Sequence, residues 1–449
     1  LVFAVGLMRK CRARLGDLWW YTLLLFAAQR VGDVINMFVG LWLVPKYVPQ
    51  SELGAVLPLS QFVSFIGIPL AIVATPFSKF LLDYGARGEY GKIKSLVRDV
   101  FICTGCLALL TLLFAYVCLP FLFARMRVPV GSLGVLIVAV SILSSVSSVF
   151  SSAVQGLKLY SATVLFNVLA APLRLILMLV FMPFRPLSGY FVGQGAAPGV
   201  SVVGALCVLR RHLGRAVRAV PYLKEDGRAM VRYAIPFLVL TVFTNLFSSV
   251  DLLVIRHRLS DFESAGYYMI SRFTDISSYL GSAFVVFLFP MVAGLKANSS
   301  DGRRTLVHSV AGTVASGAVV AAFLGLVGDG LLDLTAAWRP YRSMSVYMTP
   351  ICCLNVLMMA CGCYISYETA QGRFGFLKWM LPISGLKMVL LYAVTGYTFF
   401  AEVLPAPLLA GLAAFNPCRL SFVLTVLICG QALLALVAAA CFLRGARGA

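Results

Sequence analysis

The sequence predicts an all-α polytopic membrane protein with about twelve transmembrane helices, arranged as two parallel six-helix repeats. Hydrophobic residues make up 61% of its 449 residues and charged residues 12%, and the mean hydropathy is +0.93. Apolar segments of about 20 residues, the length that crosses a bilayer, recur along the chain. Short motifs of the first half return in the second half. Soluble proteins carry about 25% charged residues, so the composition excludes that class.

Twelve windows are long and apolar enough to span a membrane. They are 18–45, 53–77, 98–123, 131–154, 160–183, 190–209, 233–255, 265–293, 306–328, 344–367, 376–400 and 419–443. The first window follows a basic segment and contains no small-residue cleavage site, so we expect a retained helix rather than a signal peptide. A further apolar piece at 403–415 is short and contains Pro405 and Pro407, and we expect it to be interfacial or re-entrant.

The positive charges predict the topology. Lys and Arg total 37 against 17 Asp and Glu, which gives a formal net charge of +20. With the N-terminus inside, most Lys and Arg fall in the segments on the inner side, and the densest group lies at 210–232. Because cytoplasmic loops are enriched in Lys and Arg, we predict that both termini are cytoplasmic. The charges are spread over short loops and not gathered into a domain, which argues against a nucleic-acid partner.

The sequence predicts no metal site, cofactor or catalytic residue. Most of the 12 Cys lie in apolar windows, and the three His do not stand at zinc-ligand spacing from them. We interpret the Cys as small apolar helix residues. No predicted loop is large enough to form a soluble catalytic domain, so we expect that the protein is not an enzyme.

An internal repeat predicts the domain organisation. Four short matches recur in order at an offset of about 212 residues, which equals six helices and makes the repeats parallel. The matches pair Glu52-Leu53-Gly54 with Glu263-Ser264-Ala265-Gly266, Pro76 with Pro290, Leu96-Val97 with Leu306-Val307, and Gln155-Gly156 with Gln371-Gly372. We predict an N-terminal lobe at 1–209, a basic cytoplasmic linker at 210–232 and a C-terminal lobe at 233–449, with a central cavity between the lobes.

Two charge pairs lie inside predicted helices. Arg30 precedes Asp33 by three residues, and Arg272 precedes Asp275 by three. This spacing places the two side chains of a pair on one helix face. A charge at mid-membrane costs about 2.5–3.5 kcal/mol on insertion scales, so it needs a partner or a cavity. Each pair is therefore either a structural ion pair or part of a cavity wall that rearranges with a substrate or coupling ion.

Two further cations, Arg174 and Lys387, have no acid one helical turn away and occupy matching windows of the two repeats. Arg174 either snorkels to an interface or joins Lys387 in an anion site, because Arg forks onto phosphate oxygens and Lys acts as a point charge. Asp251 is a third intramembrane acid. Polar uncharged residues in early windows of each half are candidates for a cavity lining, with helix packing as the alternative: Gln29, Asn36, Gln61 and Asn245.

Two stretches carry a resemblance to a known family. In 232–292, a helix with Asp251 is followed by a short loop, an acid-x-x-Gly-Tyr step from Glu263 and a closing Phe-Pro; the other stretch, Gln-Gly-Leu-Lys-Leu-Tyr at 155–160, is followed by Asn167 and Arg174. Together with the tandem repeat, they resemble the Wzx-type polysaccharide flippases of the multidrug/oligosaccharidyl-lipid/polysaccharide exporter (MOP) superfamily.

The resemblance implies a transporter of the bacterial inner membrane. Such a protein moves a lipid-diphosphate-linked oligosaccharide to the outer leaflet, with Arg30, Arg174, Arg272 and Lys387 in a cationic cavity. Its expected partners are the lipid-linked glycan, membrane lipids and other polysaccharide-assembly proteins. Coupling to protons or sodium would use Asp33, Asp251 or Asp275.

Three alternatives remain open at this point. A cation-coupled multidrug exporter of the same superfamily would favour an acidic cavity, whereas Arg174 and Lys387 are positive. A peptidoglycan-precursor flippase usually has fourteen helices, and twelve are predicted here. A membrane glycosyltransferase or polymerase generally needs a large outward loop with catalytic residues, and the predicted outward loops are short.

Overall fold

The computed structural model describes residues 27–126, 131–157, 159–213, 220, 224–293, 300–371, 373–395 and 420–447. All regular secondary structure in these ranges is helical. Residues 27–38 form an α-helix that continues directly into the π-helix η1 (Val39–Leu43) and then into α2 (Val44–Tyr47).

The other elements follow in chain order. They are α3 (Gln50–Leu53), α4 (Val56–Ala86), α5 (Tyr90–Met126), α6 (Gly131–Gly156), α7 (Tyr160–Phe181), α8 (Pro186–Leu213), α9 (Lys224–Arg258), α10 (Asp261–Ala293), α11 (Ser300–Asp333), the 3-10 helix η2 (Arg339–Tyr347), α12 (Met348–Ala370), α13 (Leu377–Thr395) and α16 (Leu420–Arg447).

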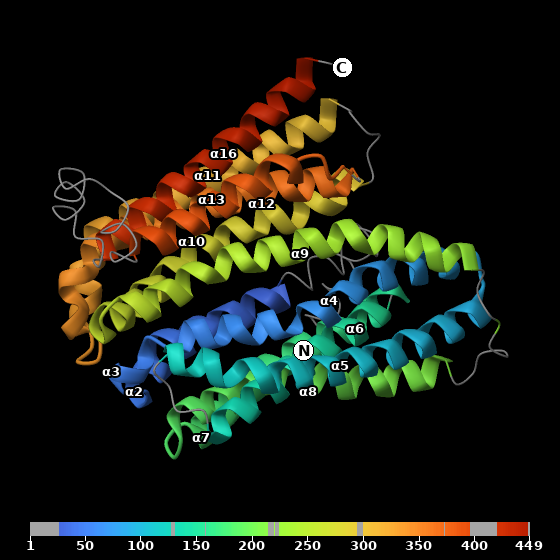
Figure 1. The fold of residues 1–449 in the computed structure, drawn as a ribbon, viewed down its shortest axis with the longest axis horizontal. Helices are drawn as coiled ribbons and strands as arrows, with labels where there is room; N and C mark the ends of the chain where they lie inside the picture. Colours follow the sequence, from blue (N-terminus) through green and yellow to red (C-terminus); the bar gives the residue numbers. More distant parts are fainter. Residues whose placement is uncertain are drawn as a thin grey trace, which may run out of the picture. The chain divides into compact units, whose positions relative to one another are not determined.

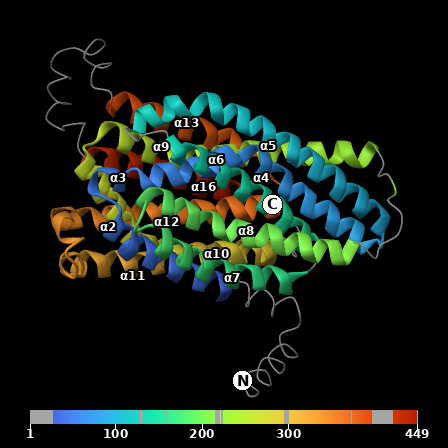
Figure 2. The same cartoon turned by 90° about the horizontal axis from the view of Figure 1, so that it is seen from below.

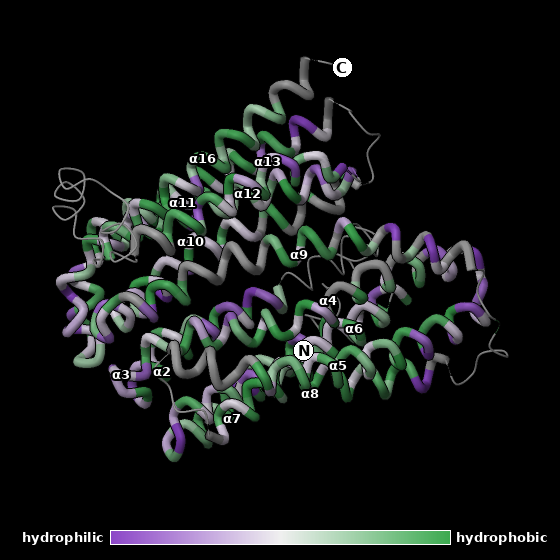
Figure 3. The backbone as a smooth tube through the Cα atoms, in the orientation of Figure 1, coloured by the Kyte–Doolittle hydropathy of each residue, from purple (hydrophilic) through white to green (hydrophobic). Residues whose placement is uncertain are grey.

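Helices of this set occupy each of the twelve predicted windows. Within the described residues, 8 helices are long and apolar enough to cross a membrane. Figure 3 shows hydrophobic residues along much of α5, α11 and α16. The protein is therefore a multi-pass membrane protein, as its composition predicts. The expected interfacial segment at 403–415 lies outside the described residues.

The chain forms two compact units. The first unit comprises Leu1–Val39 and Leu59–Val242, and the second comprises Gly40–Pro58 and Phe243–Ala449. The segment Gly40–Pro58 thus groups with the helices that follow Phe243 and not with its neighbours in sequence. In the predicted linker, α8 extends to Leu213 and α9 starts at Lys224. The predicted lobe boundaries and the cavity between the lobes stay predictions.

The core of the first unit joins α4, α5 and α6. The Phe101 and Phe150 rings stack at 4.3 Å between centroids, and Phe77 meets Phe101 edge to face at 6.5 Å. Phe77 is fully buried, and Phe150 is nearly so. Apolar burial between lipid-facing helices gives this unit a packed interior in which a polar group needs a partner.

Two glycines bring α7 and α8 close together, and Figures 1 and 2 both show these helices as neighbours. A Cβ atom at Gly189 would lie 2.5 Å from the Met182 main-chain nitrogen, and one at Gly193 would lie 2.2 Å from the Met178 Cγ atom. The two glycines are four residues apart, so they lie on one face of α8. This is the small-residue spacing that lets membrane helices approach backbone to backbone.

In the second unit, α10, α11 and α12 pack against one another, and α16 packs on α12 and α13 (Figure 1). Close approach again depends on glycine: a Cβ atom at Gly317 of α11 would lie 2.0 Å from the Val356 Cγ2 atom of α12. The second unit therefore has helix packing of the same tight kind as the α7–α8 pair.

Side chains of the second unit bind the main chain of Gly40–Pro58. Trp338 Nε1 donates to the Leu41 carbonyl oxygen at 2.7 Å, and the Tyr268 hydroxyl donates to that of Gly40 at 3.2 Å. Arg256, whose side chain is 2% exposed, donates from Nη2 to the Ser51 carbonyl oxygen at 2.9 Å and pairs through Nη1 with Asp261 at 2.9 Å. These bonds explain why the segment belongs to this unit.

Candidate functional site

The first predicted charge pair forms within the first unit. Arg30 Nη1 lies 3.1 Å from Asp33 Oδ2, and the two side chains are 25% and 17% exposed. Both residues belong to the helix 27–38, where a spacing of three residues brings them together. The acid partly neutralises the cation, and both side chains stay partly exposed.

Arg174 is held by the first helix. Its Nη1 atom donates a hydrogen bond to Asn36 Oδ1, which joins α7 to the helix 27–38. Both side chains are partly buried. Pro172 lies inside α7 two residues earlier and lacks an N–H group, so α7 loses one main-chain hydrogen bond close to Arg174. A neutral carboxamide such as that of Asn36 orients a guanidinium without cancelling its positive charge.

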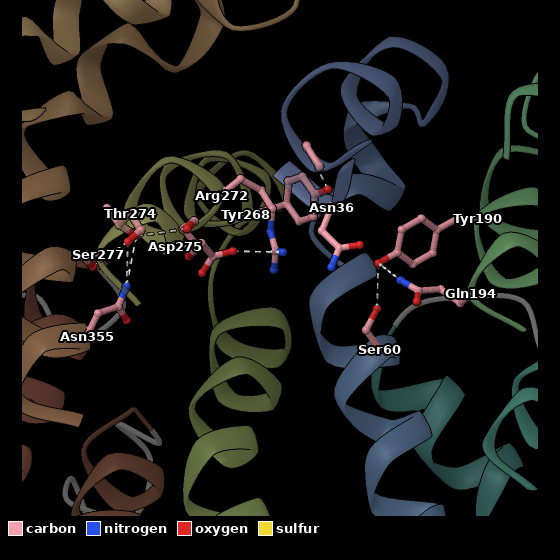
Figure 4. Close-up of polar contacts among 12 residues, drawn as sticks. Asn36, Ser60, Tyr190, Gln194, Tyr268, Arg272, Thr274, Asp275, Ser277 and Asn355 are labelled. Atoms are coloured by element: carbon pink, nitrogen blue, oxygen red, sulfur yellow. Dashed lines mark hydrogen bonds and ion pairs between the residues drawn. The ribbon is translucent and has the colours of Figure 1, made fainter. Parts of the chain in front are cut away.

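A second polar group of the first unit was not predicted from the sequence. Gln194 Nε2 donates to the Tyr190 hydroxyl at 2.7 Å, and that hydroxyl lies 3.3 Å from Ser60 Oγ (Figure 4). Tyr190 and Gln194 are four residues apart on α8, and Ser60 comes from α4. A signal for this group was present, since Gln194 stands inside an apolar window one helical turn after a tyrosine.

In the second unit, Arg272 pairs with Asp275 through Nη1 and Oδ2 at 3.0 Å. The guanidinium carbon of Arg272 also lies 5.4 Å from the centroid of the Tyr268 ring, within cation–π range. Gly40 leaves space for the Arg272 side chain, because a Cβ atom at residue 40 would lie 2.6 Å from the Arg272 Cδ atom. A predicted charge pair is thus built against the segment Gly40–Pro58 (Figure 4).

Beside this ion pair, Thr274 and Ser277 of α10 form a polar group with Asn355 of α12. Asn355 Nδ2 of α12 donates to the Thr274 carbonyl oxygen at 3.2 Å, and Ser277 Oγ donates to the same oxygen at 2.7 Å (Figure 4). Thr274 is fully buried and Asn355 partly buried. These bonds tie α12 to the part of α10 that carries Arg272 and Asp275, so they fix the position of that ion pair.

Lys387 lies in the interior of the second unit. The residue is 7% exposed, and its aliphatic stem packs on Gly430 of α16, where a Cβ atom would lie 2.6 Å from the Lys387 Cγ atom. A buried ammonium group is costly in an apolar interior, so it needs polar or charged neighbours.

The remaining predicted site residues differ in how far they are buried. Gln29 is exposed and Gln61 is partly buried. Asn245 and Asp251 lie in α9, with side chains outside the described residues. The structure therefore brings together Arg30 with Asp33, Asn36 with Arg174, and Arg272 with Asp275. Arg174 and Lys387 belong to different units, and a shared anion site stays a prediction.

The described charged and polar groups are suited to binding through charge and hydrogen bonds. Across the described ranges, no cluster of three or more His, Cys, Asp or Glu side chains is placed to hold a metal ion. Guanidinium and ammonium groups suit recognition of phosphate, and carboxylate, amide and hydroxyl groups suit recognition of hydroxyl groups.

Comparison with known proteins identifies the fold. No family model matches the chain, and no curated protein matches its sequence. The structure is similar to an inward-facing multidrug resistance MATE family transporter of the MOP superfamily, at a TM-score of 0.65 and 12% identity over 92% of this chain and 94% of that one. It is also similar to the MATE transporter VcmN of Vibrio cholerae, at a TM-score of 0.65 and 14% identity over 98% of both chains.

A third similar structure is a MOP superfamily transporter from Pyrococcus furiosus, at a TM-score of 0.57 and 13% identity over 98% of this chain and 95% of that one. Its description states that the reverse polarity of its binding pocket suggests a different function. These three structures are transporters and not enzymes. The predicted fold class is confirmed: the chain has the twelve-helix fold of the MATE transporters.

Proposed function

We propose that the protein is a flippase that moves a lipid-diphosphate-linked oligosaccharide from the cytoplasmic to the outer leaflet of a bacterial inner membrane. The transport mode is alternating access, and the product feeds cell-surface polysaccharide biosynthesis. Two lines support the proposal: the MATE-like fold and the resemblance of residues 155–160 and 232–292 to the Wzx-type flippases.

The observation that most directly supports an anionic substrate is the environment of Arg174. Its guanidinium is oriented by a neutral amide, Asn36, inside an apolar helix. The planar fork of the Arg174 guanidinium matches the oxygens of a diphosphate, and its amide partner carries no negative charge that would repel them. Lys387, 7% exposed, is the second intramembrane cation that supports an anionic substrate.

The two ion pairs provide a means of coupling. A diphosphate that approaches Arg30 or Arg272 competes with the carboxylate of Asp33 or Asp275 for the same guanidinium. The released acid then binds a proton or a sodium ion. Asp251 is a third acid for this role. In this scheme, the cations bind the substrate and the acids exchange it for an ion from outside.

The alternative is a cation-coupled multidrug exporter. The specific observation in its favour is that several similar structures are multidrug or MATE transporters. The description of the Pyrococcus furiosus transporter, however, links the reverse polarity of its binding pocket to a different function. The positive intramembrane charges of the present chain therefore favour the anionic substrate over a cationic drug.

A transport assay distinguishes the two functions. The full chain is reconstituted in liposomes and given two probes: a farnesyl diphosphate that carries fluorescent N-acetylglucosamine, and the cationic dye ethidium. We expect movement of the diphosphate sugar and no transport of ethidium. The double variant Arg174→Gln/Lys387→Gln should lose the movement of the sugar probe while still inserting and eluting as a monodisperse species.

A matched control removes two other positive charges. Arg210 and Arg211 are exposed at the end of α8, so Arg210→Gln/Arg211→Gln should keep transport within about twofold of the parent, as expected for surface substitutions. Ethidium transport with no movement of the sugar probe would replace the flippase proposal with the exporter.

A further inference from the structure

We propose that Asn36 and Gln194 form a hydroxyl-binding site for the sugar part of the substrate, beside the cation that binds its diphosphate. The inference rests on the proposed function and deepens it. The site lies entirely within the first unit, where the helix 27–38, α4, α7 and α8 contribute its side chains.

Asn36 presents a hydrogen-bond donor. An arginine donates only, so the oxygen of the Asn36 amide faces Arg174 and the amino group Nδ2 forms the other end. In the described part of the chain, Nδ2 donates to no group. The bond to Arg174 thus fixes the amide plane and directs a donor away from the cation.

Gln194 presents the complementary acceptor. Its Nε2 atom donates to the Tyr190 hydroxyl at 2.7 Å, and its Oε1 atom accepts no hydrogen bond from any described residue. The Tyr190 side chain is well anchored: the residue is 8% exposed, its ring meets Phe191 edge to face at 5.2 Å, and its hydroxyl lies 3.3 Å from Ser60 Oγ. Gln194 is therefore held by a fixed partner with its carbonyl oxygen directed elsewhere.

The two amides belong to the same region. Figure 4 shows the Asn36 amide on the side where Tyr190, Gln194 and Ser60 lie. The helix contact supports this, because a Cβ atom at Gly193, the neighbour of Gln194, would lie 3.1 Å from the Arg174 carbonyl oxygen. The cation of α7 and the acceptor of α8 are thus on helices in backbone contact.

The chemistry of the pair identifies the ligand group. A sugar carries several hydroxyl or acetamido groups that both donate and accept, so it offers partners to the Asn36 donor and to the Gln194 acceptor. A partly buried polar site discriminates strongly against a ligand that lacks the matching group, because its own polar atoms are then left unpaired. A bare lipid diphosphate would use Arg174 and leave the amides unused. The pair therefore selects glycan-bearing carriers over the free carrier.

The test compares binding of two probes to the purified full chain in lipid nanodiscs: farnesyl diphosphate, and farnesyl diphosphate linked to N-acetylglucosamine. Gln194→Met removes the acceptor at similar volume, and Gln194→Glu restores an acceptor at the same place. We expect Gln194→Met to lower affinity for the sugar-linked probe by about fivefold, the value of one hydrogen bond, with no change for the bare probe. In Gln194→Glu, the ratio of the two affinities should return to its value in the parent chain.

Asn167→Leu is the matched control, because Asn167 is an exposed amide on the same helix as Arg174; it should leave the ratio unchanged. A ratio that is equal in the parent and Gln194→Met, with both probes still bound, overturns the hydroxyl site and leaves the flippase proposal in place. Failure of the parent chain to bind either probe overturns the proposed function itself.

Discussion

The Arg272 side chain packs directly on the Cα atom of Gly40. A Cβ atom at residue 40 would lie 2.6 Å from the Arg272 Cδ atom, a distance that side-chain contacts do not reach. The same arginine is engaged by Asp275 at 3.0 Å and by the Tyr268 ring at 5.4 Å. Gly40 is therefore a structural requirement of this ion pair.

Gly40→Ala should displace Arg272 and lower the free energy of unfolding by about 1–3 kcal/mol, as expected for overpacking. The matched control is Gly32→Ala in the same helix, where a new Cβ atom would meet no atom within 4 Å. That control should be neutral or raise the stability by about 0.5–1 kcal/mol, because alanine favours a helix. Thermal unfolding of the two variants in detergent measures the difference, and equal midpoints would contradict it.

Arg256 and Asp261 should respond unequally to substitution. Arg256 is 2% exposed while Asp261 is 46% exposed, so Asp261→Asn leaves a buried cation with weaker compensation, whereas Arg256→Met leaves a carboxylate that water can solvate. We expect Asp261→Asn to cost about 1–3 kcal/mol and Arg256→Met to cost less.

Asp333→Asn serves as the reference for an exposed pair, since Asp333 and Arg342 are 40% and 60% exposed. It should change the unfolding free energy by about 0–1 kcal/mol. A larger loss of stability in Arg256→Met than in Asp261→Asn would contradict this expectation and would show that the Arg256 bond to the Ser51 carbonyl oxygen outweighs the ion pair.

Gly430 and Lys387 should be energetically coupled. The glycine provides the slot for the lysine stem, since a Cβ atom at residue 430 would lie 2.6 Å from Lys387 Cγ, so Gly430→Ala should cost about 1–3 kcal/mol in the parent chain. In the Lys387→Ala background the stem is absent, and the same change should cost less than half as much. A double-mutant cycle from thermal or denaturant unfolding gives the coupling energy, and simple additivity of the two changes would refute the contact.

Trp338→Phe should destabilise the segment Gly40–Pro58. The substitution removes the 2.7 Å bond to the Leu41 carbonyl oxygen but keeps an aromatic ring against Phe273. An unsatisfied buried carbonyl costs about 1–3 kcal/mol. Trp379→Phe is the control, because Trp379 is 60% exposed, and its unfolding midpoint should match that of the parent chain.

Features set by nearby residues could be predicted from the sequence. A spanning helix depends on the length of an apolar run, and helices lie in all twelve predicted windows. The pairs Arg30–Asp33 and Arg272–Asp275 form because a spacing of three residues already brings the charges together.

Contacts between distant residues could not be predicted in this way. Asn36 and Arg174 form a hydrogen bond although they are 138 residues apart in sequence, and Ser60 and Tyr190 form one although they are 130 residues apart. Such bonds depend on which helices pack together. An amide or a hydroxyl in an apolar window has no sequence pattern that identifies its partner. The contact between two of the repeat motifs is a further example, because Ser264 Oγ donates to the Gly54 carbonyl oxygen at 3.2 Å.

Gly40–Pro58 belongs to the second unit although it lies early in the sequence, and this limits where the chain can be divided into fragments. A polypeptide that starts at Phe243 would lack the main-chain acceptors that Trp338, Tyr268 and Arg256 bind, so three donors would lose these partners. A cut between α8 and α9 leaves the late fragment without Gly40–Pro58 and the early fragment without the part of α9 up to Val242 that belongs to the first unit. Co-expressed, they would have to recover the fold by complementation, with the early fragment supplying a piece of the late one.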